Sequence, residues 1–303
     1  MSLLSRLFGQ NKPFWEKLFT PQELDTFYSE VKKYFSKRGE FFSLQNGYVV
    51  SKDKHRKMDL RNVAQICHGS EITQWAIIIE DHFQHLEKVN NTAINYSTSN
   101  FSDISDNLVV RLWPDGTLQN VGSDNLFYRK ELAGTISTIA LDLPDSVLAV
   151  TPEMVNAWGK DLNDLFSLGY QNVLRICEPD IVETVLANRV KVLVITKENN
   201  FFTATHILLL KNHPRCVGAF GSLVSVPVRD LIMCYPINEK QDISQVAIIL
   251  AEVTQEVLRK GPGSVSPYLY WYYKENYEVI RYESYKKPIG IPCNLKELLE
   301  SPQ

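Results

Sequence analysis

The densest group of residues able to do metal or acid–base chemistry reads Glu-Asp-His-Phe-Gln-His and runs from Glu80 to His85. On a helix, Asp81 and His85 are four residues apart and His82 and His85 are three apart, so pairs of these side chains could reach one metal ion. His82 also adjoins an apolar stripe made of Ile79, Phe83 and Leu86. A half-buried histidine with an ordinary hydrogen-bond partner explains this pattern better. We predict no metal site and keep a metal at His82 and His85 as the alternative.

The five cysteines stand at positions 67, 177, 216, 234 and 293. Their number is odd and no pair has the CxxC spacing of a zinc or redox site, which favours reduced thiols in a cytoplasmic protein. Cys67 adjoins His68, but a cysteine with unplaced histidines does not by itself indicate a nucleophilic dyad. We therefore expect no catalytic cysteine.

Arg229 and Asp230 separate two apolar runs, at a place where a turn is expected. The planar fork of an arginine there could bind a carboxylate or a phosphate. It could also pair with Asp142 or another acid and hold the turn, which we favour. Asp142 and Asp145 stand around Pro144, a pattern more typical of a turn than of catalysis. Arg229, Asp230 and Asp142 are candidate binding residues, and the same three would serve an alternative function, an enzyme acting on a small molecule or a phosphoester.

Half of the 14 tyrosines lie between residues 268 and 285, with Trp271 among them. Strand alternation puts Tyr270 and Tyr272 on one face and Trp271 on the other. Tyrosine joins apolar area to a hydroxyl, which suits an interface with a partner protein. Packing of these rings against one another inside a sheet is the competing interpretation. We take Tyr270, Trp271 and Tyr272 as candidate binding residues.

Motifs of common catalytic sites are missing from the sequence. It holds no GxxxxGK[ST] phosphate loop, no HExxH, no EF-hand loop and no GxSxG. Pro179-Asp180 before the apolar run 190–196 is similar to metal-dependent nucleases, but the carboxylate that should stand two residues before the lysine is absent. We therefore predict a non-catalytic protein without a cofactor that acts through contacts with an unidentified protein partner.

The composition is that of a core-forming chain. Its 303 residues are 44% hydrophobic and 22% charged, which excludes general disorder. The 32 basic and 35 acidic residues give a net charge of −3, which argues against a nucleic-acid partner. No run approaches the length of a transmembrane helix.

Periodicity and turn residues predict the elements that carry these side chains. Thr20, Pro21 and Glu23 form a capping box, Asn46-Gly47 indicates a hairpin, and Asn199 and Asn200 can cap the segment 202–211, which we expect to be a helix rather than a strand. The expected helices cover 21–37, 71–88, 151–158, 161–176, 202–211 and 243–260. The expected strands cover 41–44, 48–50, 108–113, 136–143, 190–196, 223–228, 231–235, 268–273 and 277–282.

These elements predict an α+β fold in which amphipathic helices cover antiparallel sheets. We expect an N-terminal arm (1–19), an N-terminal α+β unit (20–89), a linker or long loop (90–106), a C-terminal α+β unit (107–285) and a tail (286–303). Whether the two units are related stays open, since both hold a helix, a Lys-Gly or Arg-Gly stop and a hairpin. The arm should pack on the body; peripheral membrane contact through residues 1–19 is the alternative.

Three segments resemble the bacterial YtpQ-like family of unknown function: Leu-Asp-Leu-Pro-Asp-Ser from Leu141, the capped helix containing Trp158, and Ser-Val-Pro-Val-Arg-Asp from Ser225. The stretch from Asn199 to Leu210 is similar too, so that the resemblance spans residues 107–285. It implies an uncharacterised cytoplasmic bacterial protein and brings no catalytic residues.

Overall fold

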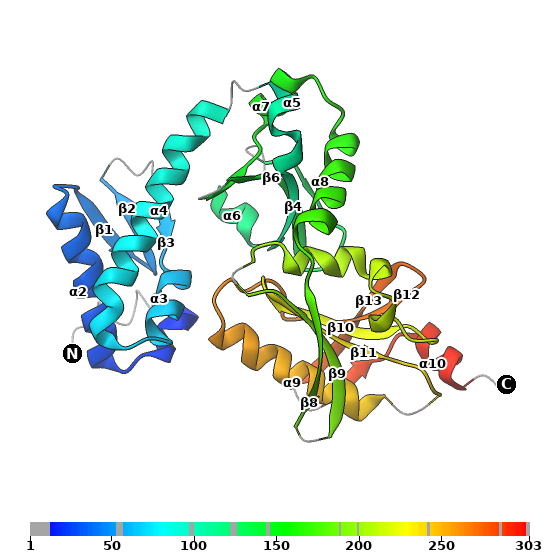
Figure 1. Ribbon diagram of the computed structural model, residues 1–303. Helices are drawn as coiled ribbons and strands as arrows, with labels where there is room; N and C mark the ends of the chain where they lie inside the picture. The colour runs from blue at the N-terminus through cyan, green and yellow to red at the C-terminus, as the bar shows by residue number, and fades with distance from the viewer. Residues whose placement is uncertain are drawn as a thin grey trace. The chain divides into compact units, whose positions relative to one another are not determined.

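The computed structural model describes residues 13–52, 57–96, 100–121, 126–143, 146–187, 189–198, 200–240, 243–284 and 287–300. The chain divides into two compact units, Met1–Lys88 and Val89–Gln303. The division falls inside helix α4 (Trp75–Tyr96), drawn in cyan in Figure 1. The segment predicted as a linker or loop, 90–106, is therefore helical up to Tyr96 and again in α5 (Phe101–Ile104). A helix already formed over Trp75 to Lys88 is extended at low cost, even by residues of modest helix propensity.

The first unit joins helices to a small antiparallel sheet. The sheet has the order β1-β2-β3, and its strands are β1 (Phe42–Gln45), β2 (Tyr48–Ser51) and β3 (Lys57–Asp59). The helices are η1 (Phe14–Leu18), α2 (Pro21–Lys37), α3 (Arg61–His68), η2 (Ile72–Gln74) and α4.

Two local predictions in this unit are confirmed. The Glu23 amide donates to Thr20 Oγ1 (3.3 Å) and the Thr20 amide donates to Glu23 Oε2 (2.7 Å), which completes the capping box. Asn46 and Gly47 both have positive φ (48° and 80°), as a tight hairpin turn requires.

Aromatic rings build the core of the first unit. Trp15 and Phe19 from the N-terminal arm are buried against Phe27 and Trp75. The described part of the arm therefore packs on the body, as predicted. Residues 1–12 lie outside the described residues, and so does most of the segment expected to reach a membrane. Within the described ranges, no helix is both long and apolar enough for a membrane span.

The second unit begins with a four-stranded antiparallel sheet. Its strands are β4 (Leu108–Pro114), β5 (Tyr128–Arg129), β6 (Thr135–Leu143) and β7 (Ser146–Ala149), and it is accompanied by η3 (Ser105–Asn107), α6 (Thr117–Val121), α7 (Pro152–Trp158) and α8 (Leu162–Ile176). Helix α8 packs closely on β4 at Gly169 (Figure 1), where an added Cβ would lie only 2.9 Å from Val110 Cγ2.

A seven-stranded antiparallel sheet follows, with the order β14-β13-β12-β10-β11-β9-β8. Its strands are β8 (Asp180–Leu186), β9 (Val190–Thr196), β10 (Ser222–Val228), β11 (Leu231–Pro236), β12 (Leu269–Tyr273), β13 (Asn276–Ser284) and β14 (Lys287–Gly290). Helix α9 (Ser244–Lys260) packs on one face (Figure 1) and the 3₁₀ helix η5 (Thr203–Asn212) on the other. The elements η6 (Pro214–Cys216) and α10 (Cys293–Glu300) complete the unit.

The α+β class with antiparallel sheets is thus confirmed, with several corrections of detail. The segment 202–211 is a helix rather than a strand, as predicted; it is a 3₁₀ helix with a kink at Leu209, and Asn200 Oδ1 accepts from the Phe202 amide just before it (2.7 Å). Asn199 lies outside the described residues. The expected tail forms β14 and α10, because Leu295 buries its side chain in the core. The elements that were not predicted include β3, α3, α6, β5, β7 and β8.

Candidate functional site

Arg229 is held in place at the turn between β10 and β11. Its backbone amide donates to the Gly263 carbonyl (3.0 Å), and its own carbonyl accepts from the Ala204 amide (2.8 Å). Its side chain passes over Gly263, where an added Cβ would lie 2.7 Å from Arg229 Cδ. Gly263 has a φ of +73°, a conformation that glycine adopts without strain. Backbone contacts and a glycine therefore fix the direction of Arg229.

A second arginine meets Arg229 at the ring of Phe201. The guanidinium carbon of Arg229 lies 4.3 Å from the centre of the Phe201 ring, and that of Arg111 lies 5.2 Å from the same centre. Arg111 comes from β4, and its guanidinium carbon also lies 3.7 Å from the centre of the Trp113 ring. Residues distant in sequence thus place two guanidinium groups around one phenyl ring.

The beginning of η5 ties the two arginine-bearing segments together. Thr205 Oγ1 donates to the carbonyl of Val110, the residue before Arg111 (2.9 Å). The Ala204 amide donates to the carbonyl of Arg229. Since Phe201 stands two residues before this helix, the ring and both arginines are positioned by one connected set of contacts at its start.

Neither guanidinium group is neutralised by the described part of the chain. Arg111 and Arg229 make no side-chain hydrogen bond or ion pair with a described residue, and the Nε atom of Arg111 is buried without a partner. Burial and, to a lesser extent, the positive charge of Arg229 together lower the pKa of Arg111 to about 9. Burial also lowers the pKa of Arg229, which the Asp230 charge partly offsets. Two like charges withdrawn from water are costly when the described residues around them offer no counter-ion.

The two predicted acids do not supply a counter-ion. Asp230 follows Arg229 and acts on it only at a distance; its carbonyl accepts from Thr196 Oγ1 (2.9 Å). Asp142 lies on β6 opposite Val147, where burial raises its carboxyl pKa, and it forms no ion pair with Arg229. Of the predicted residues, the structure therefore brings only Arg229 into the site.

The predicted tyrosine face is part of the core. Tyr270, Trp271 and Tyr272 are 0%, 3% and 5% exposed. The Tyr270 hydroxyl donates to the Ala133 carbonyl (2.7 Å), and Trp271 Nε1 donates to the Phe220 carbonyl (3.0 Å). The rings of Tyr270 and Tyr272 both pack against Tyr277 of β13, as the competing interpretation of packing inside the sheet expects. The three side chains offer little surface to a partner.

The alternative metal and thiol sites find no support in the described residues. There, no three His, Cys, Asp or Glu side chains converge as metal ligands would. His82 is half-buried against Phe83, whereas His85 is exposed. Cys67 is buried, and burial raises its thiol pKa to about 12, the opposite of what a nucleophile needs. None of the five cysteines forms a disulfide.

Arg111 and Phe201 were missed by sequence reasoning. Arg111 is the lone charged residue of the strand run from Leu108 to Pro114. A charge inside a buried strand is unusual and could have been singled out. Its meeting with Arg229 depends on tertiary packing, which local sequence patterns do not reveal.

No family model, curated protein or solved structure matches this chain. The resemblance to the YtpQ-like family, the bacterial origin and the cytoplasmic location therefore stay predictions.

Proposed function

We propose that this chain is a binding protein whose ligand presents a phosphate or carboxylate group to Arg111 and Arg229. The observation that carries the proposal is the meeting of two guanidinium groups at Phe201 with no described residue to neutralise them. An arginine stacked on an aromatic ring keeps its N–H groups at the edge of the guanidinium plane, where they can form a fork with a carboxylate or phosphate.

Access and cost both support a ligand. Arg111, Phe201 and Arg229 are each only partly buried, and we take the exposed part of their surface as the route by which a small anion reaches them. In the absence of an anion the two charges destabilise the fold, since each disfavours the charged form of the other. A bound anion would reverse this effect, and the fold would then be stabilised by its ligand.

Binding is better supported than catalysis. The alternative enzyme needs Asp142 as an acid or base beside Arg229, and these residues share no ion pair or hydrogen bond. Action through a protein partner stays a prediction. Because Tyr270 and Tyr272 are buried, a surface that binds a protein partner has to lie elsewhere on the chain.

The test is a thermal-unfolding titration of the full chain with inorganic phosphate, sulfate, acetate and citrate. If only phosphate, or only the carboxylates, raise the unfolding temperature, the result identifies the chemical class of the ligand. We expect Arg111→Met and Arg229→Met each to lower the affinity for the anion that raises the unfolding temperature by about tenfold or more, because each variant loses a charged hydrogen bond. Arg129→Met is the matched control, because Arg129 stacks on Phe166 (4.0 Å) but already has Asn163 Oδ1 as acceptor (2.6 Å). Equal responses of all four proteins would contradict the proposal.

A further inference from the structure

Strand β8 is an edge of the seven-stranded sheet. Each of its residues is paired with β9, from Asp180 opposite Thr196 to Leu186 opposite Val190, without a register shift. On its other side β8 pairs with no strand of the described chain. An edge strand presents a row of unpaired backbone N–H and C=O groups, which can pair with an added strand.

Three of the usual protections of an edge, namely proline, lysine and a β-bulge, are absent from β8. Val182 and Val185 are 52% and 50% exposed. Being three residues apart, they lie on opposite faces of the sheet. An added strand would therefore cover apolar surface on both faces.

The charge of this edge is one-sided. Glu178, Asp180 and Glu183 are exposed, and no basic residue stands between 178 and 186. Glu183 pairs with Lys191 of β9 (3.2 Å), but both side chains are more than half exposed, so this ion pair is weak and exchangeable. Cross-strand pairs of opposite charge stabilise a sheet and like charges oppose it.

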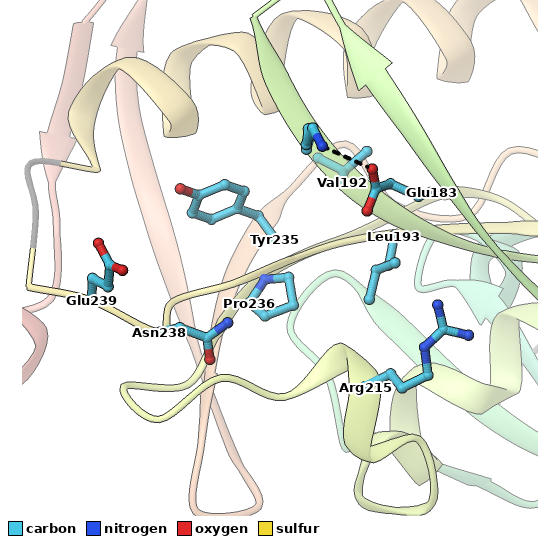
Figure 2. Close-up of a pocket in the computed structure, with 9 residues that line it drawn as sticks. Glu183, Val192, Leu193, Arg215, Tyr235, Pro236, Asn238 and Glu239 are labelled. Atoms are coloured by element: carbon cyan, nitrogen blue, oxygen red, sulfur yellow. Dashed lines mark ion pairs between the residues drawn. The ribbon is translucent and has the colours of Figure 1, made fainter.

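A cavity of about 330 Å³ opens beside Glu183 (Figure 2). Glu183 and Leu193 are directly paired across β8 and β9, so their side chains share the face on which the cavity lies. Figure 2 shows Glu183, with its dashed ion pair, at one side of the cavity and Glu239 at the other. The cavity balances these two acids with Lys191 and Arg215. The cavity therefore offers room for a long side chain of a partner but does not select its charge. The preference for a basic partner comes from the acidic residues of β8.

We propose that the β8 edge binds an extended segment of a partner protein, added as an antiparallel strand with a Lys or Arg opposite Glu183 and another opposite Asp180. The positions opposite Val182 and Val185 are apolar or β-branched. Since Asp180 and Glu183 lie on opposite faces, the two basic residues of the partner stand three apart in its sequence. A second copy of this chain fits less well, because β8 against β8 would bring acidic strands together.

The probe is the capped peptide Thr-Val-Thr-Lys-Val-Thr-Lys, which places its residues as the proposal requires. In an NMR titration of the full chain we expect the amide signals of β8 to shift. We expect the peptide with both lysines changed to glutamate, and the peptide with proline for its central lysine, to bind at least about fivefold more weakly, as lost charge and backbone pairs predict.

The matched variants are Glu183→Lys on the edge and Glu71→Lys on an exposed position of the first unit. We expect Glu183→Lys to weaken binding of the lysine peptide, again by at least about fivefold, and Glu71→Lys to leave it unchanged. Equal binding of the lysine and glutamate peptides, or shifts that avoid β8, would overturn it. A dimer of the chain that light scattering detects and Glu183→Lys changes would overturn the choice of occupant.

Discussion

Arg111 and Arg229 rest their guanidinium groups on one phenyl ring, that of Phe201, at 5.2 and 4.3 Å from its centre. Buried cationic side chains of a protein are usually paired with a carboxylate. Here the described chain supplies none, and burial lowers the pKa of both. The two positive charges therefore lower the stability of the fold, and a bound anion would offset this loss.

Replacing Arg111 should separate stability from binding. We expect Arg111→Met to leave the free energy of unfolding unchanged or raise it by about 1 kcal/mol, since methionine keeps the apolar stem and removes the uncompensated charge. Phosphate or carboxylate binding should be lost at the same time. Denaturant unfolding at neutral pH measures this, with Arg129→Met as the control. That variant should lose about 1 kcal/mol with the Asn163 hydrogen bond. A clear loss of stability in Arg111→Met would show that Arg111 has a structural role.

The free energy of unfolding should depend on pH because Arg111 loses its proton in the folded state. Its folded-state pKa, about 9, lies below the ordinary value of 12.5, so the charged form costs stability at every pH below 9. This cost is lost as the pH rises through 9 toward 12.5. The wild-type chain should therefore gain stability relative to Arg111→Met as the pH rises across 9. Unfolding free energies of both proteins on either side of that pH measure the gain, and a constant difference would argue against a buried, uncompensated Arg111.

Gly263 should position Arg229 for its ligand. An alanine Cβ there would lie 2.7 Å from Arg229 Cδ, so Gly263→Ala should displace the side chain and weaken anion binding. The positive φ should also cost about 1–2 kcal/mol of stability. Gly159→Ala is the control, because Gly159 has a φ of +60° and nothing within 4 Å of an added Cβ. If both variants lose stability but bind the anion equally, Gly263 does not position Arg229.

The Tyr270 hydroxyl should matter for stability alone. It donates to the Ala133 carbonyl and contacts Ser266 Oγ (2.6 Å) in the core. Tyr270→Phe should cost about 1–3 kcal/mol, because it leaves buried acceptors unpaired, and should leave anion binding unchanged. Tyr268→Phe, at a 42% exposed residue, should cost little. Equal unfolding free energies of these two variants would mean that the Tyr270 contacts are weak.

Local rules predicted much of the fold. The capping box at Thr20 and the turn at Asn46-Gly47 act within a few residues, so that their chemistry is written in adjacent positions. Strand β8 escaped prediction because an edge strand with acids among its valines shows little alternation. The tyrosine-rich hairpin was placed correctly, but burial of Tyr270 depends on contacts with Ala133, far away in sequence.

The site itself was only partly predictable. Arg229 stands at a turn that the sequence marks, and its ability to bind an anion follows from its type. Arg111 and Phe201 join it through the packing of η5 between β4 and the turn after β10. Such long-range pairing has no local pattern, which is why Asp142 was the expected partner and Arg111 the observed one.

Calorimetric titration of the full chain with the anion that most raises its unfolding temperature tests the central claim most directly. The account predicts saturable binding of one anion per chain, weakened by about tenfold or more in both Arg111→Met and Arg229→Met and unchanged in Arg129→Met. Binding that persists undiminished in both arginine variants, or no binding of any phosphate or carboxylate, would contradict it.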